Sequence, residues 1–479
     1  MNTATALTAF TAMLPEHFLL LGMVLLIVLE IVGRERASPT FPLVVALVCV
    51  GAAAAAAAAL ALQGYSAAPF AGHFSVAPAA LMGKAVVLAL ALPVLLMSRD
   101  EFEGVEFPVL LLSSLYGACL MQSADSFPTL FLGLEILSLP VYVLVMLAYR
   151  RKQSAEAALK YLVLGGAATA MFLMGVSLLY GSGASLGIPA DRTMALQVFG
   201  VALGSHDTMA RAAVVLVLLS LFLKAAIVPF HAWAPDAYEG ASVPVTAYMA
   251  VIVKAAVLLA AVRLFGDAVL ASPMLELVAV LPLLSIVWGN LAAMRQASLR
   301  RMVAYSSIAH AGYLFYALLG DPEGRLQATV FYLLAYGLLN LLVFAALPAA
   351  DDDRERDLLS RLQGLFQRSP FAALMIGIAM LSLAGIPPFP GFIAKFLIFK
   401  NVVAAGYTTY AVLGLVGSYL GIYFYLRVIQ LMFMSADAAP AGAAGVSPAA
   451  THWAALASAA CLAATLAVAV FPGWVLAWL

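Results

Sequence analysis

Charged side chains are scarce in this sequence of 479 residues. They make up 10% of the chain, with 24 basic and 24 acidic residues, whereas soluble domains average about 25%. So few charges cannot cover the surface of a water-soluble chain of this length, which excludes a soluble enzyme and a disordered protein. The formal net charge is zero, so no polycationic surface attracts phosphate groups, and a nucleic-acid-binding protein is excluded too.

Cysteine is also rare, and no cofactor motif is present. Cys49, Cys119 and Cys461 stand singly within apolar runs, without CxxC or metal-ligand spacing. We interpret them as small buried hydrophobic residues. No G-x-G-x-x-G motif follows a predicted strand. A secretory leader is not expected either, because Glu16 and His17, rather than a basic segment, precede the first apolar run.

Apolar residues are abundant instead, at 65% of the chain. They form fourteen segments, most of them about long enough to cross a bilayer as a helix. The sequence therefore predicts an all-α polytopic membrane protein with about 14 transmembrane helices. The predicted spans lie near 15–33, 41–62, 78–98, 108–124, 127–149, 159–181, 211–229, 243–265, 273–294, 302–319, 326–349, 369–397, 407–434 and 453–478.

The distribution of basic residues predicts the orientation. With the N-terminus outside, thirteen basic residues fall in cytoplasmic loops and five in or beside outer loops, so the positive-inside rule places both termini outside. The thirteen are Arg34, Arg36, Arg99, Arg150, Arg151, Lys152, Arg295, Arg300, Arg301, Arg354, Arg356, Arg361 and Arg368. The five are Arg192, Arg211, Arg263, Arg325 and Lys400.

The other six basic residues fall within or just inside predicted spans: Lys84, Lys160, Lys224, Lys254, Lys395 and Arg427. Three of these lysines and one acidic residue, Glu135, lie far from helix ends; the lysines are Lys224, Lys254 and Lys395. Each costs about 2.5–3.5 kcal/mol at the bilayer centre, so these four indicate a hydrated interior, mutual pairing, or both. A purely structural role is the alternative for each.

Buried amines suit a proton relay. Burial favours the neutral form of a lysine and a nearby carboxylate favours the ammonium form, so moving one partner switches the charge. Further candidates for this relay, with weaker support, are Lys160, His231, Tyr305, Ser306 and His310. Ser306 and His310 share a helix face, as do Ser220 and Lys224.

Each weaker member has a structural alternative. Lys160 can simply snorkel to the interface, and His310 can be a satisfied interior histidine. Lys84 and Arg427 are interpreted as snorkelling or helix-packing residues. His231 is a possible gate, but the nearby stretch 235–244 can equally be a capping loop.

Two predicted spans are interrupted by proline, at Leu223–His231 and at Leu383–Lys395. Paired interruptions of this kind are typical of inverted repeats around a midplane ion site. The breaks lie in the seventh and the twelfth predicted spans. Because they are five spans apart, an odd number, the second repeat would cross the membrane in the opposite direction to the first. We predict a single membrane domain with N-terminal spans in 1–107, repeats in 108–272 and 273–435, and a last span in 436–479. Chance placement of the prolines is the alternative.

Four stretches together resemble the antiporter-like membrane subunits of respiratory complex I. They are Phe131–Pro140, Lys224–Tyr238, Arg301–Tyr313 and Ala384–Lys395. Nearly the whole chain shares the resemblance, which is strongest to the N-type subunit of bacterial NADH–quinone oxidoreductases. The lysine at Lys395 suits the N type, since the M-type paralogue has glutamate there. A long lateral helix like that of the L-type paralogue is not expected.

The resemblance implies proton translocation driven by quinone reduction elsewhere in the assembly, in the bacterial inner membrane. Glu135, Lys224, Lys254 and Lys395 match the family's functional positions. Other membrane subunits of the complex and the lipid bilayer are the implied partners. No cofactor is expected in this chain; NADH, FMN, iron–sulfur clusters and quinone belong to other subunits.

The sequence therefore predicts a subunit that receives protons near Lys160, Lys224 or His231 and passes them by Lys254 and His310 to Lys395. Two alternatives stay open. A stand-alone cation/proton antiporter would need a carboxylate-rich cation site, and Glu135 is the only acidic residue near a span centre. A scaffold that does not pump would keep the buried charges for assembly alone.

Overall fold

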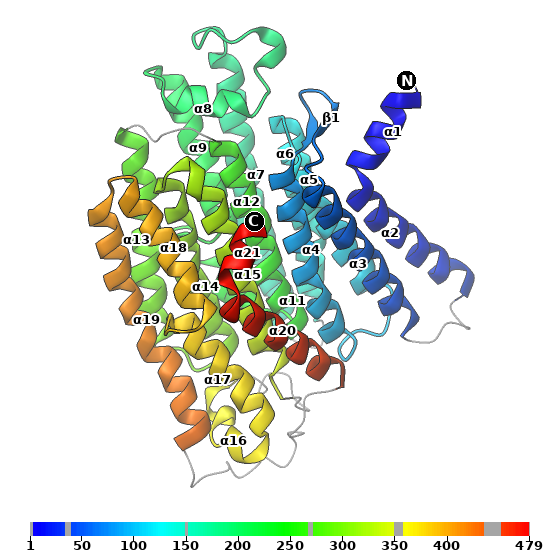
Figure 1. Cartoon of the computed structure of the whole chain (residues 1–479), viewed down its shortest axis with the longest axis vertical. Helices are drawn as coiled ribbons and strands as arrows, with labels where there is room; N and C mark the ends of the chain where they lie inside the picture. Colours follow the sequence, from blue (N-terminus) through cyan, green and yellow to red (C-terminus); the bar gives the residue numbers. More distant parts are fainter. Residues whose placement is uncertain are drawn as a thin grey trace.

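A computed structural model of the chain describes residues 3–33, 40–148, 152–266, 272–348, 358–434 and 452–478. Helices form almost all of it (Figure 1). Six of the basic residues used for the orientation lie outside the described residues, as does the boundary predicted at 435/436. Those six are Arg34, Arg36, Arg150, Arg151, Arg354 and Arg356.

Within the described residues, eleven helices are long and apolar enough to cross a membrane, or twelve if one bent pair counts as a span. The polytopic all-helical prediction is therefore confirmed, while the number fourteen stays a prediction. The eleven are α2 (Leu14–Gly33), α3 (Phe41–Leu62), α4 (Pro78–Ser98), α6 (Phe127–Met146), α7 (Lys152–Ser182), the Val243–Phe265 helix, α13 (Ser272–Ala293), α14 (Leu299–Tyr316), α15 (Pro322–Ala345), α19 (Thr408–Met434) and α20 (His452–Val470). The Val243–Phe265 helix consists of α11 (Val243–Tyr248), the π-helical turn η2 (Met249–Val253) and α12 (Lys254–Phe265).

The other predicted spans are shorter or broken. The bent pair is α8 (Gln197–Leu203) with α9 (Thr208–Lys224), at 119°. The remaining span helices are α5 (Glu106–Gln122), α17 (Pro370–Ala384) and α18 (Pro390–Ala404). The last predicted span, 453–478, is α20 followed by α21 (Pro472–Trp478).

A few small elements were not predicted. A two-stranded antiparallel sheet, β1 (Ala67–Phe70) and β2 (Phe74–Val76), joins α3 to α4. Short helices cap the bundle: α1 (Thr3–Ala12), η1 (Ala190–Arg192), α10 (Trp233–Gly240), η3 (Ala317–Leu319), η4 (Leu359–Leu362) and α16 (Leu365–Arg368). The stretch 235–244 is thus largely helical rather than a simple capping loop.

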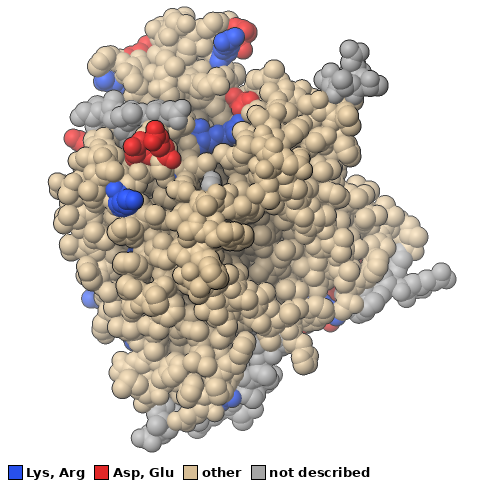
Figure 2. Space-filling view, viewed as in Figure 1, with Lys and Arg blue, Asp and Glu red and all other residues tan. Residues whose placement is uncertain are grey.

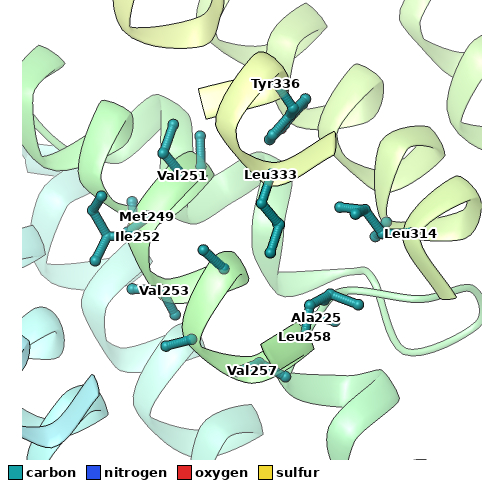
Figure 3. Close-up of a cluster of buried hydrophobic side chains, with 14 of the residues drawn as sticks. Ala225, Met249, Val251, Ile252, Val253, Val257, Leu258, Leu314, Leu333 and Tyr336 are labelled. Atoms are coloured by element: carbon teal, nitrogen blue, oxygen red, sulfur yellow. The ribbon is translucent and has the colours of Figure 1, made fainter. Parts of the chain in front are cut away.

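The helices are arranged around one buried centre. Figure 1 shows α1–α3 at one edge and α13 and α19 at the opposite edge, with α4, α11, α12 and α15 between them. The Val243–Phe265 helix is fully buried and α15 nearly so, whereas most of the residues of α2 are not buried. Figure 3 shows apolar side chains of η2, α12, α14 and α15 gathered in this centre. Ionisable residues on these central helices are therefore shielded from lipid by other helices.

The surface has the pattern of a membrane protein. In Figure 2, most of the visible charged side chains lie toward the upper end, a few lie at the lower edges, and the broad band between them is almost free of charge. Large apolar side chains such as Val163, Val416 and Tyr419 are 59–71% exposed. Exposed apolar side chains of this size are stable next to lipid tails. The three cysteines are free and buried, as predicted.

Both predicted interruptions are present. α9 ends at Lys224, one turn earlier than the span predicted to reach 229, and Ala226 takes a left-handed φ of 61°. α17 ends at Ala384, followed by Gly385 with φ 86°. Proline would prevent either helix from continuing. The breaks place Lys224 and Lys395 beside free helix ends, while the inverted relation between 108–272 and 273–435 stays a prediction.

Candidate functional site

The first buried lysine, Lys224, lies against one face of α6. Glu135, Ser138 and Tyr142 follow at i, i+3 and i+7, so their side chains share that face. Lys224 Nζ donates to Ser138 Oγ at 3.0 Å and to the Tyr142 hydroxyl at 3.4 Å. Glu135 Oε1 lies 3.8 Å from Lys224 Nζ and accepts a 2.6 Å hydrogen bond from Thr169 on α7. Sequence positions far apart thus form one cluster.

The geometry of this pair leaves the amine free to change its charge. The distance between Glu135 and Lys224 is too long for a direct hydrogen bond, so the carboxylate acts through its charge. The Glu135 side chain is 22% exposed at the edge of the molecule, and the Lys224 side chain 3%. Ser138 and Tyr142 can accept from an ammonium or donate to a neutral amine. A small movement of Glu135 would therefore change how strongly its charge stabilises the Lys224 ammonium.

The second buried lysine, Lys254, follows a π-helical turn, η2 (Met249–Val253). Turns of this kind occur often at functional sites. Its ammonium donates to both the carbonyl and the hydroxyl oxygen of Ser307 on α14. Ser307 Oγ also lies 3.4 Å from the hydroxyl of Tyr238 on α10. The amine therefore has neutral oxygen partners, with no ion pair among the described residues.

His310 on α14 lies in a network of hydroxyl groups. Its Nδ1 is 2.8 Å from the hydroxyl of Tyr332, and its Nε2 is 3.1 Å from that of Tyr425. Ser306 Oγ is 2.5 Å from the same Tyr425 hydroxyl. Each hydroxyl can donate and accept, so the imidazole can take either tautomer without losing a partner. This arrangement suits proton transfer through the ring.

The third buried lysine, Lys395, lies at the second break. Its Nζ donates to the carbonyls of Leu383 and Ala384, at 3.0 and 3.3 Å, and to Ser418 Oγ at 3.0 Å. The carbonyls are those left free at the C-terminal end of α17, where the helix dipole is negative. The ring of Tyr313 lies 5.2 Å away. The broken helix thus supplies the partners that stabilise this amine.

Lys395 also lines a cavity of about 390 Å³ between α18 and α19. The aromatic side chains of Phe392, Phe396 and Tyr419 form much of its wall. All three are at least 41% exposed, so the cavity opens at the apolar side of the bundle.

One helix, α14, connects the surroundings of Lys254 with those of Lys395. Ser306, Ser307, His310 and Tyr313 lie within two turns of α14, and each contacts a group named above. The surroundings of Lys254, His310 and Lys395 are therefore joined through this one helix. The described hydrogen bonds of Lys224 lead to α6 and do not reach this group.

Four polar residues singled out from the sequence lie apart from these contacts. Lys160 is at the surface, with 45% exposure of its side chain. His231 Nε2 accepts from Trp288 on the exposed side of α13, at 3.0 Å. Tyr305 is half-buried and makes none of the hydrogen bonds above. Ser220 Oγ is buried without a partner in the described structure.

Lys160 belongs to a cluster of charges around α10. Its Nζ lies 2.7 Å from both Glu156 and Asp236, while Arg301 Nη1 lies 3.0 Å from Asp236 and 2.8 Å from Glu239. Burial raises the pKa of the Asp236 carboxyl, but hydrogen bonds from Lys160 and Arg301 more than offset this effect. The pKa of Asp236 therefore lies below its usual range, and the carboxylate stays charged at neutral pH.

Sequence reasoning missed several partners. Ser138 and Tyr142 carried a signal, their i+3 and i+7 spacing from Glu135. Thr169, Tyr332 and Tyr425 carried none, because their contacts join distant segments.

A second buried pair was also missed. Lys84 Nζ lies 2.5 Å from Glu16 Oε1, and both side chains are fully buried. Lys84 therefore packs between helices and does not snorkel. Arg427 donates to the carbonyl of Met294 at 2.9 Å, which is also a packing contact. In the described part of the chain, no group of three or more His, Cys, Asp or Glu side chains has the arrangement of a metal site.

Comparison with known proteins gives one family. Residues 124–421 match the family described as "NADH:quinone oxidoreductase/Mrp antiporter, TM". The chain is 38% identical to the NADH-quinone oxidoreductase subunit N of Pelobacter propionicus, over 88% of this chain and 89% of that protein. It is 35% identical to the NADH-quinone oxidoreductase subunit N 2 of Rhizobium meliloti, over 99% of this chain and 98% of that protein.

Solved structures show the same fold. A chain of respiratory complex I from Thermus thermophilus, solved with bound Aureothin, is 35% identical, with a TM-score of 0.82 over 96% of this chain and 98% of that chain. A chain of the Mrp complex from Dietzia is 24% identical, with a TM-score of 0.81 over 100% of this chain and 96% of that one. At 24% identity, the likeness to the Mrp chain concerns the fold alone.

Proposed function

The chain belongs to the membrane subunits of the NADH:quinone oxidoreductase/Mrp antiporter family, and on that premise we propose that it is a proton-translocating N-type subunit of a bacterial respiratory complex I. It works with other membrane subunits of that complex, within the bilayer. The proposed location is the inner membrane, with both termini outside.

The observation that carries the proposal is the set of three buried amines beside broken or irregular helices. Lys224 ends α9, Lys254 follows a π-helical turn, and Lys395 lies against the free end of α17. A chain that needed only to fold would insert more favourably with leucine at each position. Carbonyl and hydroxyl oxygens, rather than carboxylates, accept from Lys254 and Lys395 among the described residues. These surroundings allow the amines to gain and lose protons.

The proposed route begins near Lys224, whose charge Glu135 controls from the edge of the molecule. It continues past Lys254 and the hydroxyl network of His310 to Lys395. Ser306 and Tyr425 extend that network. Lys160, His231 and Tyr305 have no place in the interior route, and Lys160 is assigned to the surface cluster instead.

The energy must come from outside this chain. Moving one charge against a membrane potential costs about 2.3 kcal/mol per 100 mV. We propose that quinone reduction in other subunits supplies it and that the redox cofactors bind there. Glu135, which is partly exposed at the edge of the bundle, is placed to receive an electrostatic signal from a neighbouring subunit.

Replacing Lys395 by methionine tests the route. The variant keeps the volume of the side chain and removes the amine, and we expect NADH-driven acidification of inverted membrane vesicles to fall at least fivefold. Lys400→Met is the matched control, because Lys400 lies on the same helix but is exposed. Assembly of the complex with an unchanged number of protons pumped per electron in Lys395→Met would show that this residue is not part of the relay.

A stand-alone cation/proton antiporter is the second candidate, favoured only by the shared fold with the Mrp complex. Such a protein would move sodium in exchange for protons without partners. Purified chain in liposomes should therefore show no sodium-dependent proton flux. A robust flux would favour the antiporter.

A further inference from the structure

One end of α10 reaches the surroundings of the first buried lysine. Trp233 Nε1 donates to the carbonyl of Leu223 at 2.8 Å, next to Lys224 at the free end of α9. The Trp233 ring stacks on Tyr161, with ring centres 4.3 Å apart and planes 8° apart. Tyr161 in turn packs edge-on against Tyr142 at 4.6 Å, and the Tyr142 hydroxyl accepts from Lys224. These contacts place α10 beside the residue that precedes Lys224 and, through Tyr161, join it to Tyr142, a partner of the same amine.

The other end of α10 reaches the second buried lysine. The Tyr238 hydroxyl lies 3.4 Å from Ser307 Oγ, which accepts from Lys254. Trp233 and Tyr238 belong to one helix of eight residues. A shift or rotation of α10 would therefore disturb the surroundings of both lysines together, through Tyr161 on one side and Ser307 on the other.

The outer face of α10 is held by charge. Asp236 Oδ2 binds Lys160 of α7, and its Oδ1 binds Arg301 of α14, so one carboxylate joins α10 to two long helices. These side chains are 29–45% exposed, and ion pairs that are this accessible to solvent are weak. The connection can thus be made and broken within a working cycle.

We propose that Asp236 is a positioning residue that holds α10 in place and so couples the charge on Lys224 to the charge on Lys254. This inference rests on the proposed function and adds to it the element that links the two lysines. Asp236 acts through Trp233 and Tyr238 and does not itself carry the transported proton.

The test compares three variants of the intact complex in inverted membrane vesicles, with pumping normalised to the amount of assembled complex. Asp236→Asn keeps the shape and removes the charge, and its pumping should fall at least threefold. Asp236→Glu should keep more than half of the wild-type rate. Glu156→Gln is the matched control: Glu156 binds the same Lys160 but lies on α7, so pumping should not change. Wild-type pumping by Asp236→Asn would overturn the proposal.

A double-mutant cycle separates coupling from general destabilisation. Tyr238→Phe removes only the hydroxyl that faces Ser307 and should lower pumping at least twofold. Because both substitutions break the same connection, the combination with Asp236→Asn should pump no less than Asp236→Asn alone. Losses that multiply would overturn the proposal. If Asp236→Asn fails to assemble, an unchanged rate in Tyr238→Phe overturns it alone.

The Lys395→Met variant keeps the two ideas distinguishable. If Lys395→Met pumps normally, the proposed function fails. If Lys395→Met is inactive while Asp236→Asn pumps normally, the function stands and only the role of Asp236 is wrong.

Discussion

Replacing Glu135 by glutamine removes the charge that faces Lys224 and keeps the size of the side chain. At 3.8 Å and an effective dielectric constant of about 20, the attraction amounts to about 4 kcal/mol. The carboxylate is 22% exposed, and solvent screening reduces the loss to roughly 1.5–3 kcal/mol. Since each 1.36 kcal/mol is a factor of ten, we expect proton pumping to slow roughly 10- to 100-fold.

The assay is NADH-driven acidification of inverted membrane vesicles, corrected for the amount of assembled complex. Glu135→Asp keeps the charge one methylene further away and should retain a large part of the rate. Thr169→Val removes the hydroxyl that donates to Glu135 at 2.6 Å but keeps the carboxylate, so its rate should fall between the two. Pumping at the wild-type rate in Glu135→Gln would refute the electrostatic role of this carboxylate.

Two further predictions concern packing. A Cβ at Gly165 would lie 1.9 Å from the Tyr142 hydroxyl, so Gly165→Ala should displace the Tyr142 ring from Lys224 and slow pumping several-fold. A Cβ at the neighbouring Gly166 would have no atom within 4 Å, so Gly166→Ala should pump normally in the same vesicle assay. Lys84→Met leaves the Glu16 carboxylate buried without its partner and should destabilise the fold by roughly 3–5 kcal/mol. Thermal unfolding measures this loss, and adding Glu16→Gln should restore most of it; no gain would contradict the reasoning.

The sequence predicted the main features of the site because charge inside an apolar chain is conspicuous. Lys224, Lys254 and Lys395 stood out against long apolar runs, and the prolines marked the breaks that lie beside two of them. Helix periodicity also placed Ser306 and His310 on a common face, and both reach Tyr425.

What the sequence could not show were contacts between distant segments. Lys160 lies near the start of its predicted span, so the sequence allowed it to reach the interface, but its ion pair with Asp236, 76 residues away, could not be predicted. His231 follows the break directly but points to Trp288 on α13. Glu16 lies near the start of a span, and its burial depends on Lys84 in another helix. Periodicity describes one helix at a time, so it cannot determine such pairings.

A density map of the assembled complex that resolves ordered water tests the central claim most directly. If protons move between the buried amines, water molecules should fill the gap between Lys224 and Lys254 and continue past His310 to Lys395, within hydrogen-bonding distance of each amine. Tightly packed apolar side chains in that gap, with Lys224 bound directly to Glu135 in every state of the working enzyme, would contradict the account.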